Sequence, residues 1–215
     1  MNTLSQILGD QERSYNQFAD DIISKLYCAL PAIVESVNFE NQTLEASPVT
    51  IMKRTNDAGM VTDFKLPLLV DVPFQCYKGG DYSITVPVKQ GDECLIIFTD
   101  VDFSAWFQNG GFNYAEHSFQ HAYSNAMAIV GFSSEVKAVK NYNPNAIEIR
   151  NADASEKISL SAGNITLKSA TITLDGNVTT TGTSNLQRTT TIQGKEFLAH
   201  AHSNGNEGAN TGGVV

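Results

Sequence analysis

Apolar residues in the first part of the chain recur at spacings of mostly three and four, which predicts a helix over residues 3–29 with one apolar face. The stripe consists of Leu4, Ile7, Leu8, Tyr15, Phe18, Ile22 and Leu26. Pro31 is expected to end the helix, because proline removes a backbone donor and disfavours helix in the residue before it. Residues 1–30 therefore form a helical segment that packs on the next domain, or docks onto a neighbouring subunit or hub protein.

The next hundred or so residues alternate between short β-type runs and polar turns, and we assign residues 31–135 to one domain. The expected strands are residues 33–37, 43–53, 66–74, 82–88, 94–98 and 127–132. Residues 102–107 and 115–123 are expected to form a short helix or loop. Such a set of short strands predicts a small closed barrel, with the OB-fold as the leading candidate. Residues 136–146, an Asn-rich stretch with Pro144, are expected to be a linker.

A seven-residue repeat then begins. Ile158-Ser-Leu160, Ile165-Thr-Leu167 and Ile172-Thr-Leu174 are its clearest members, Ile147-Glu-Ile149 precedes them, and Val178, Leu186 and Ile192 follow more loosely. The apolar residues are two and five apart, whereas a coiled coil needs three and four. Each member is a three-residue strand too short to bury its apolar face alone. Three chains wound around one axis would bury these faces, which predicts an intertwined trimeric β-helix spike over residues 147–196.

Composition separates the two halves and narrows the classes of function. Of the 19 aromatic residues, 18 precede Asn143, and 15 of the 37 residues in 155–191 are Ser or Thr. The chain has 14 basic and 23 acidic residues, a net charge of −9, which argues against nucleic acid as a partner. Three cysteines do not suggest a disulfide framework. Neither a signal peptide nor a membrane-spanning stretch is expected, so we expect synthesis in the cytoplasm.

His200 and His202 are the candidate metal ligands, in an apex of residues 197–215. In an extended chain residues two apart share a face, so both imidazoles can point together. Three chains would supply six imidazoles in an octahedral arrangement. This disfavours tetrahedral zinc and suits a divalent first-row metal such as iron, with nickel as a competitor. A six-histidine shell leaves no open position for water or substrate, so the metal is expected to be structural.

Two further histidines, His117 and His121, are four residues apart and would share one face of a helix. They lack the Glu of a His-Glu-X-X-His motif, and we expect them to be structural. Neither a nucleophile elbow nor a phosphate-binding glycine loop occurs. The sequence therefore predicts a protein that is not an enzyme.

Several segments resemble the central spike, or membrane-piercing needle, of contractile-tailed bacteriophages and phage-tail-like particles. Residues 66–73, the run to Gly79-Gly80, and Thr85-Val-Pro-Val-Lys-Gln-Gly-Asp-Glu-Cys-Leu95 resemble the family's N-terminal OB-fold domain. Asp102 with Trp106, and residues 121–126, are similar to its later signature, although Asn125 stands where Asp is expected. The tip resembles a His-X-His followed by a Thr-Gly-Gly ending, but the chain finishes in Val-Val where Pro is common.

The resemblance implies an OB-fold collar, a three-chain β-helix and an apex with one iron ion held by six histidines. It also implies a place in the virion, at the distal centre of the baseplate under a hub or tail-tube protein. Sheath contraction would then drive the spike through the host's outer membrane. No lysozyme-like domain is inserted, so peptidoglycan degradation is not implied.

Two other classes stay open. The first is a trimeric fibre tip that binds a receptor or surface glycan, which would use distal aromatics. The second is an OB-fold protein that binds single strands, which would need a basic groove.

Overall fold

The computed structural model describes residues 4–55, 59–118 and 120–197. It is mainly β with few helices, and it separates into two compact units, Met1–Val139 and Lys140–Val215. Each unit is described by itself below.

The N-terminal helix is present as α1, Leu4–Lys25. The predicted end was wrong, because Pro31 lies inside strand β1 (Ala29–Asn38) and the helix ends six residues before it. Tyr27 explains the early end. Its side chain is only 8% exposed in the core of the first unit, so the chain has to leave the helix before it. Pro31 lies early in the strand, where its carbonyl accepts a hydrogen bond from the Val49 amide at 3.1 Å.

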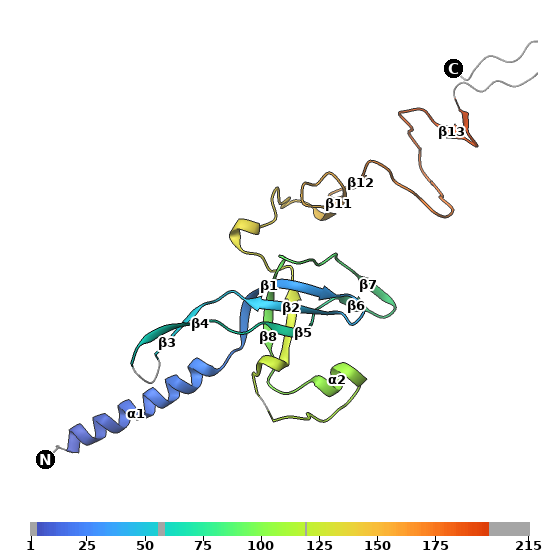
Figure 1. The fold of residues 1–215 in the computed structure, drawn as a ribbon. Coiled ribbons are helices and arrows are strands. Elements are labelled where there is room, and N and C mark those ends of the chain that lie inside the picture. Colours follow the sequence, from blue (N-terminus) through green and yellow to red (C-terminus); the bar gives the residue numbers. More distant parts are fainter. Residues whose placement is uncertain (1–3, 56–58, 119, 198–215) are drawn as a thin grey trace, which may run out of the picture. The chain divides into compact units, whose positions relative to one another are not determined.

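Five antiparallel strands form the main sheet of the first unit, which curls into a half-barrel (Figure 1). In addition to β1 they are β2 (Thr43–Pro48), β5 (Leu69–Pro73), β8 (Glu93–Phe98) and β9 (Ala126–Val130). Their order is β5-β2-β1-β8-β9, so the fourth of these strands along the chain lies beside the first, as in a Greek key. A parallel bridge between Phe74 and Ala128 links the two ends of the sheet and explains its curl.

The core of this unit fills the inside of the curled sheet. Along β8 the inward residues Cys94, Ile96 and Phe98 are at most 2% exposed, whereas the residues between them are half-buried. This period of two is the one expected of a strand with one buried face. Phe98 also joins an aromatic cluster with Tyr27 and Tyr123, whose ring centroids are 5.4 to 6.1 Å apart.

Smaller elements decorate the half-barrel. They are the hairpins β3 (Met52–Thr55) with β4 (Val61–Phe64) and β6 (Tyr77–Gly79) with β7 (Tyr82–Ile84), helix α2 (Ser104–Asn109), and 3₁₀ turns at Tyr123–Asn125 and Glu135–Lys137. The strand predicted over residues 43–53 is thus two strands, because β2 ends at Pro48. The strand predicted over residues 82–88 ends at Ile84, before Pro87, which has no amide to donate to a ladder.

The second unit begins with a three-stranded antiparallel sheet of β10 (Ile147–Arg150), β11 (Lys157–Ser161) and β12 (Asn164–Lys168). A hairpin of β13 (Thr191–Ile192) and β14 (Lys195–Glu196) follows. The strands predicted around 158–160 and 165–167 are therefore present. The strand predicted at 172–174 is absent from the described single chain, as are strands at Val178 and Leu186. A three-residue strand needs a hydrogen-bonded neighbour, and the described part of the chain supplies none to that stretch.

Candidate functional site

One face of the β10–β12 sheet is apolar and exposed, with nothing covering it among the described residues of the chain. Antiparallel register places its six aliphatic side chains in two rows across the strands: Ile147, Leu160 and Ile165, then Ile149, Ile158 and Leu167. Their exposed fractions run from 44% for Ile158 to 73% for Ile147. Ile172 and Leu174 continue the pattern along the chain and are 49% and 63% exposed. We call these eight side chains the repeat face.

The opposite face of the same sheet is polar, yet more buried. Glu148 and Arg150 follow each other on this face of β10, and each side chain is only 8% exposed. The Glu148 carboxylate lies 2.7 Å from the Lys157 ammonium and 3.5 Å from Nε of Arg150. The Ser159 hydroxyl, on the neighbouring strand, donates to the same carboxylate at 3.3 Å. The hydrogen bond from Lys157 is the first cause that lowers the pKa of Glu148 below its ordinary value.

The start of the second unit occupies this polar face. Arg150 donates hydrogen bonds to the backbone carbonyls of Lys140 and Asn141, the second of them at 3.3 Å. The Asn143 side chain contributes to the lowered pKa of Glu148 through a further hydrogen bond. Residues 140–143 of the chain therefore cover the polar side of the sheet, whereas the apolar side stays exposed among the described residues. A soluble domain normally does the reverse, and a contiguous exposed apolar patch marks an interaction surface.

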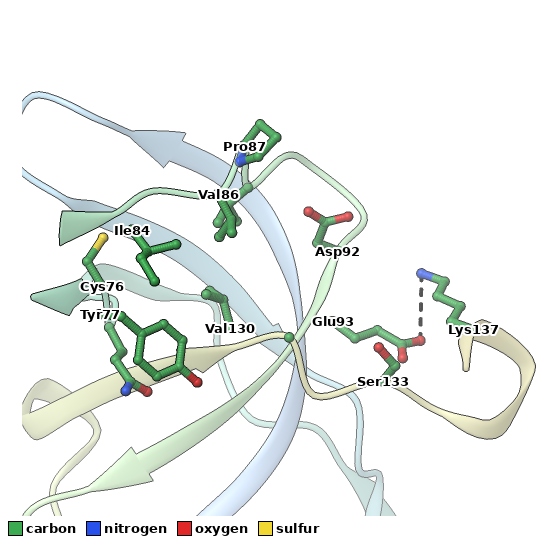
Figure 2. A pocket seen from close by; sticks show the side chains of 13 residues that line it. Cys76, Tyr77, Ile84, Val86, Pro87, Asp92, Glu93, Val130, Ser133 and Lys137 are labelled. Carbon is green, nitrogen blue, oxygen red and sulfur yellow. Dashed lines mark ion pairs between the residues drawn. The ribbon is translucent and has the colours of Figure 1, made fainter. Parts of the chain in front are cut away.

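A feature of another kind is a pocket of about 520 Å³ in the first unit (Figure 2). Its walls are mainly apolar, with Tyr77, Ile84, Val86 and Val130 turned into it. At its rim the Glu93 carboxylate lies 3.6 Å from the Lys137 ammonium. The backbone amide and hydroxyl of Ser134 also donate to this carboxylate, and the amide is the first cause of its lowered pKa. The pocket can hold an apolar group while its charges stay at the rim.

His117 and His121 do not share a helical face, because residues 115–122 contain no helix among those described and His121 has a positive φ of 50°. The two rings have separate partners. Nδ1 of His117 lies 2.8 Å from the Asp102 carboxylate. Nδ1 of His121 lies 3.0 Å from the Tyr27 carbonyl oxygen and its Nε2 lies 3.1 Å from Asp100. Each ring thus connects the loop after α2 to another part of the unit, in keeping with the structural role expected of them.

Asp102 is the most perturbed carboxylate of the first unit. Its side chain is 2% exposed, and hydrogen bonds from the Ser104 hydroxyl, then from the Ser104 amide and from His117, lower its pKa far below the ordinary value. It thereby fixes the start of α2 and the loop that carries His117. Nearby Asn125 is 1% exposed, and its backbone carbonyl accepts a hydrogen bond from the backbone amide of Thr99 at 2.9 Å. A neutral amide suits such burial better than the Asp expected there, since a buried charge needs a partner.

The predicted metal ligands His200 and His202 lie outside the described residues. Within the described part of the chain, no group of three or more His, Cys, Asp or Glu side chains could hold a metal ion. No described helix is both long and apolar enough to cross a membrane.

The segment that forms the half-barrel matches a known sequence family. Residues 30–131 match the family described as phage protein Gp138 N-terminal domain. The match spans just under half of the chain and runs from the first residues of β1 to the end of β9. It supports a structural protein of a phage, and with it a component of the virion. No curated protein matches the chain.

The sequence analysis missed the charged cluster of Glu148, Arg150 and Lys157. A signal for it exists, because all three residues belong to the strands that carry the repeat and alternate with its aliphatic residues. The register pairs Arg150 with Lys157, and Glu148 neutralises both. Opposite charges on one face of adjacent repeat strands could therefore have indicated a shared polar side.

Proposed function

We propose that this chain is the central spike of a contractile-tail baseplate, a homotrimer that pierces the outer membrane of the host when the sheath contracts. The observation that carries the proposal is the repeat face: eight aliphatic side chains in a seven-residue repeat, each 44–73% exposed in the single chain. Three chains around one axis would turn these side chains inward and give Ile172–Leu174 the strand partners that a single chain cannot supply. The Gp138-type match is consistent with a phage structural role and does not distinguish a spike from a fibre.

The half-barrel agrees with this proposal. Five strands, a Greek-key order and a partly open closure between Phe74 and Ala128 are the features of an OB-fold. In the proposed particle three OB-folds form a collar at the wide end and bind the hub or tail-tube protein. In this proposal the chain acts mechanically, with the work supplied by contraction of the sheath. It has no enzymatic activity of its own.

The proposed tip carries one iron ion per trimer, bound by His200 and His202 of each chain. The donor set fits such an ion, since imidazole binds divalent first-row metals and six donors favour an octahedral site. Nickel also suits an octahedral site of imidazole donors, whereas structural zinc prefers four ligands. The ion would hold three Gly- and Asn-rich ends together at a point beyond the last strand.

Two measurements on the purified protein test the proposal. Light scattering after size exclusion should give three chains per particle, and elemental analysis should give one iron per three chains. His200→Ala should abolish metal binding and leave the trimer intact, whereas Ser203→Ala, one residue beyond His202, should retain the metal. A metal-free trimer prepared without chelator would refute the tip, and a monomer would refute the spike.

The second candidate is a trimeric fibre tip that binds a receptor or glycan, which the same match and the same repeat face also permit. Immunogold labelling of virions with an antibody against residues 147–196 separates the two. Gold at the centre of the baseplate supports the spike, whereas gold at fibre ends, together with binding on a glycan array, supports the fibre.

A further inference from the structure

A second apolar surface, on helix α1, has no covering in the described chain. Tyr15 is 74% exposed, Phe18 66% and Ile22 52%. These residues are three and four apart, and the sequence extends the same spacing toward the N-terminus through Leu4, Leu8 and the polar Gln11. The full series has spacings of four, three, four, three and four, which is the a/d pattern of three heptads.

The width of this stripe indicates what kind of surface covers it. A helix that packs on a globular domain has an apolar face of three to four residues in every two turns, whereas a strict a/d seam is the narrower stripe of a coiled coil. In the middle of α1, at residues 10–21, the apolar side chains are Tyr15, Phe18 and the small Ala19. The seam is narrow through residues 10–21 and widens beyond them, where Ile23 is 67% exposed beside Ile22; its narrow part fits a second helix with the same spacing.

Position in the chain supports a second copy as that helix. Only three residues separate Lys25, the end of α1, from the first residue of β1, and Tyr27 among them is anchored in the core. Three copies of the half-barrel held around one axis would thus start three helices at equivalent points, in parallel and in register. Gly9 also lies inside α1, where glycine destabilises a helix, so the helix gains from packing along its length.

We propose that α1 forms a parallel three-stranded coiled coil with α1 of two further copies of this chain, with Tyr15, Phe18 and Ile22 at its axis. The inference rests on the proposed trimer and adds a second interface at the end of the chain opposite to the repeat. It gives residues 4–25 a role in assembly and leaves the half-barrel to bind the hub. The two apolar surfaces of the chain then serve the same threefold axis.

Disulfide trapping in the full-length protein tests this arrangement. In a Cys28→Ser background, which removes an exposed thiol next to the helix, Ile22→Cys places identical thiols at the axis. Mild oxidation should convert most chains into disulfide-linked dimers, each with a third chain left over. Asp20→Cys, an exposed position on the outer side of the same helix, should give at least about five-fold less dimer, since only a and d residues face the partner helices. Phe18→Cys is a second seam position in case one variant folds poorly.

Light scattering on the same samples separates the two proposals. If the protein is a trimer but Ile22→Cys and Phe18→Cys cross-link no more than Asp20→Cys, the coiled coil is overturned and the spike proposal stays intact. Helix α1 then binds another protein. A particle that is monomeric before oxidation overturns both. Selective cross-linking within a trimer supports the coiled coil.

Discussion

The repeat face makes a quantitative prediction for Ile165→Ser. Ile165 lies in the first row of the repeat face, between Leu160 of the neighbouring strand and solvent, and is 69% exposed in the single chain. Complete burial of an isoleucine side chain is worth about 1.5–3 kcal/mol, so burial of the part still exposed contributes about 1–2 kcal/mol per chain. The substitution occurs three times in a trimer and therefore weakens association by about 3–6 kcal/mol per particle.

Converted at about 1.4 kcal/mol per factor of ten, this loss lowers the association constant of the trimer by about 10²- to 10⁴-fold. Sedimentation equilibrium over a concentration series measures that constant directly. Thr166→Ser is the matched control, because residue 166 is the next one on the same strand and belongs to the opposite face. The control should trimerise like the parent protein, and heat unfolding of the half-barrel, which lies in the other compact unit, should be unchanged in both variants.

The outcome that would refute the reasoning is equally specific. If Ile165→Ser and Thr166→Ser associate as tightly as the parent protein, the repeat face is not the interface. If the parent protein is itself a monomer at micromolar concentration, three-chain burial is not what the repeat encodes.

The remaining predictions concern the first unit. Ile96→Ala should cost about 2–5 kcal/mol of unfolding free energy in urea, because Ile96 is fully buried, whereas Val70→Ala, 60% exposed, should change it by about 0.5 kcal/mol or less. Side-chain and backbone hydrogen bonds from one neighbouring serine are the first causes that lower the pKa of Asp102. The Asp102 carboxylate therefore binds a proton more readily in the unfolded chain than in the folded chain. Its contribution to stability is complete above about pH 4 and declines below that pH. Urea unfolding at a series of pH values should show this decline in the parent protein, and the decline should be absent in Asp102→Asn. Burial raises the pKa of the Cys94 thiol to about 11, so a thiol reagent at mildly alkaline pH should modify exposed Cys28 at once and Cys94 only on unfolding; equal rates would contradict the burial.

Much of the half-barrel could be predicted from local pattern. The short apolar run at residues 94–98, preceded by a Gly-Asp turn, predicted β8 to within one residue of its observed start. The boundaries at Pro48 and Pro87 were harder, because a proline ends a strand only where the ladder needs its missing amide. The hairpin of β3 and β4 depends on contacts between distant residues. Arg54 stacks on Phe64 at 3.7 Å and donates a hydrogen bond to the Tyr27 hydroxyl at 2.6 Å, and no local pattern encodes either contact.

The candidate site divides in the same way. Spacings of two and five predicted the aliphatic rows, because strand geometry alone places those residues on one face. The polar side could not be predicted in detail, since the partners of Arg150 include backbone carbonyls of residues 140 and 141, which have no sequence signature. The prediction that His117 and His121 share a helical face was wrong for a related reason. Its spacing of four suggested a helix, but contacts with Asp102 and Tyr27 hold the two rings in an irregular loop.

The two faces of the C-terminal sheet also constrain each other. A slip of β11 by one residue along β10 would turn Ile158 and Leu160 toward Glu148 and Arg150, and would expose Lys157 and Ser159 on the repeat face. Such a slip would remove Lys157 from the Glu148 carboxylate, whose side chain is 8% exposed, and would leave it only Arg150 on its own strand; the loss of a close partner from a buried charge is unfavourable. The charged cluster therefore selects the register that keeps all six aliphatic side chains of the sheet together. A lone sheet gains little from that arrangement, because the six side chains remain 44–73% exposed to water. This register is consistent with a face that is buried by another surface, and in the proposed trimer that surface is the same seven-residue repeat of another copy of the chain.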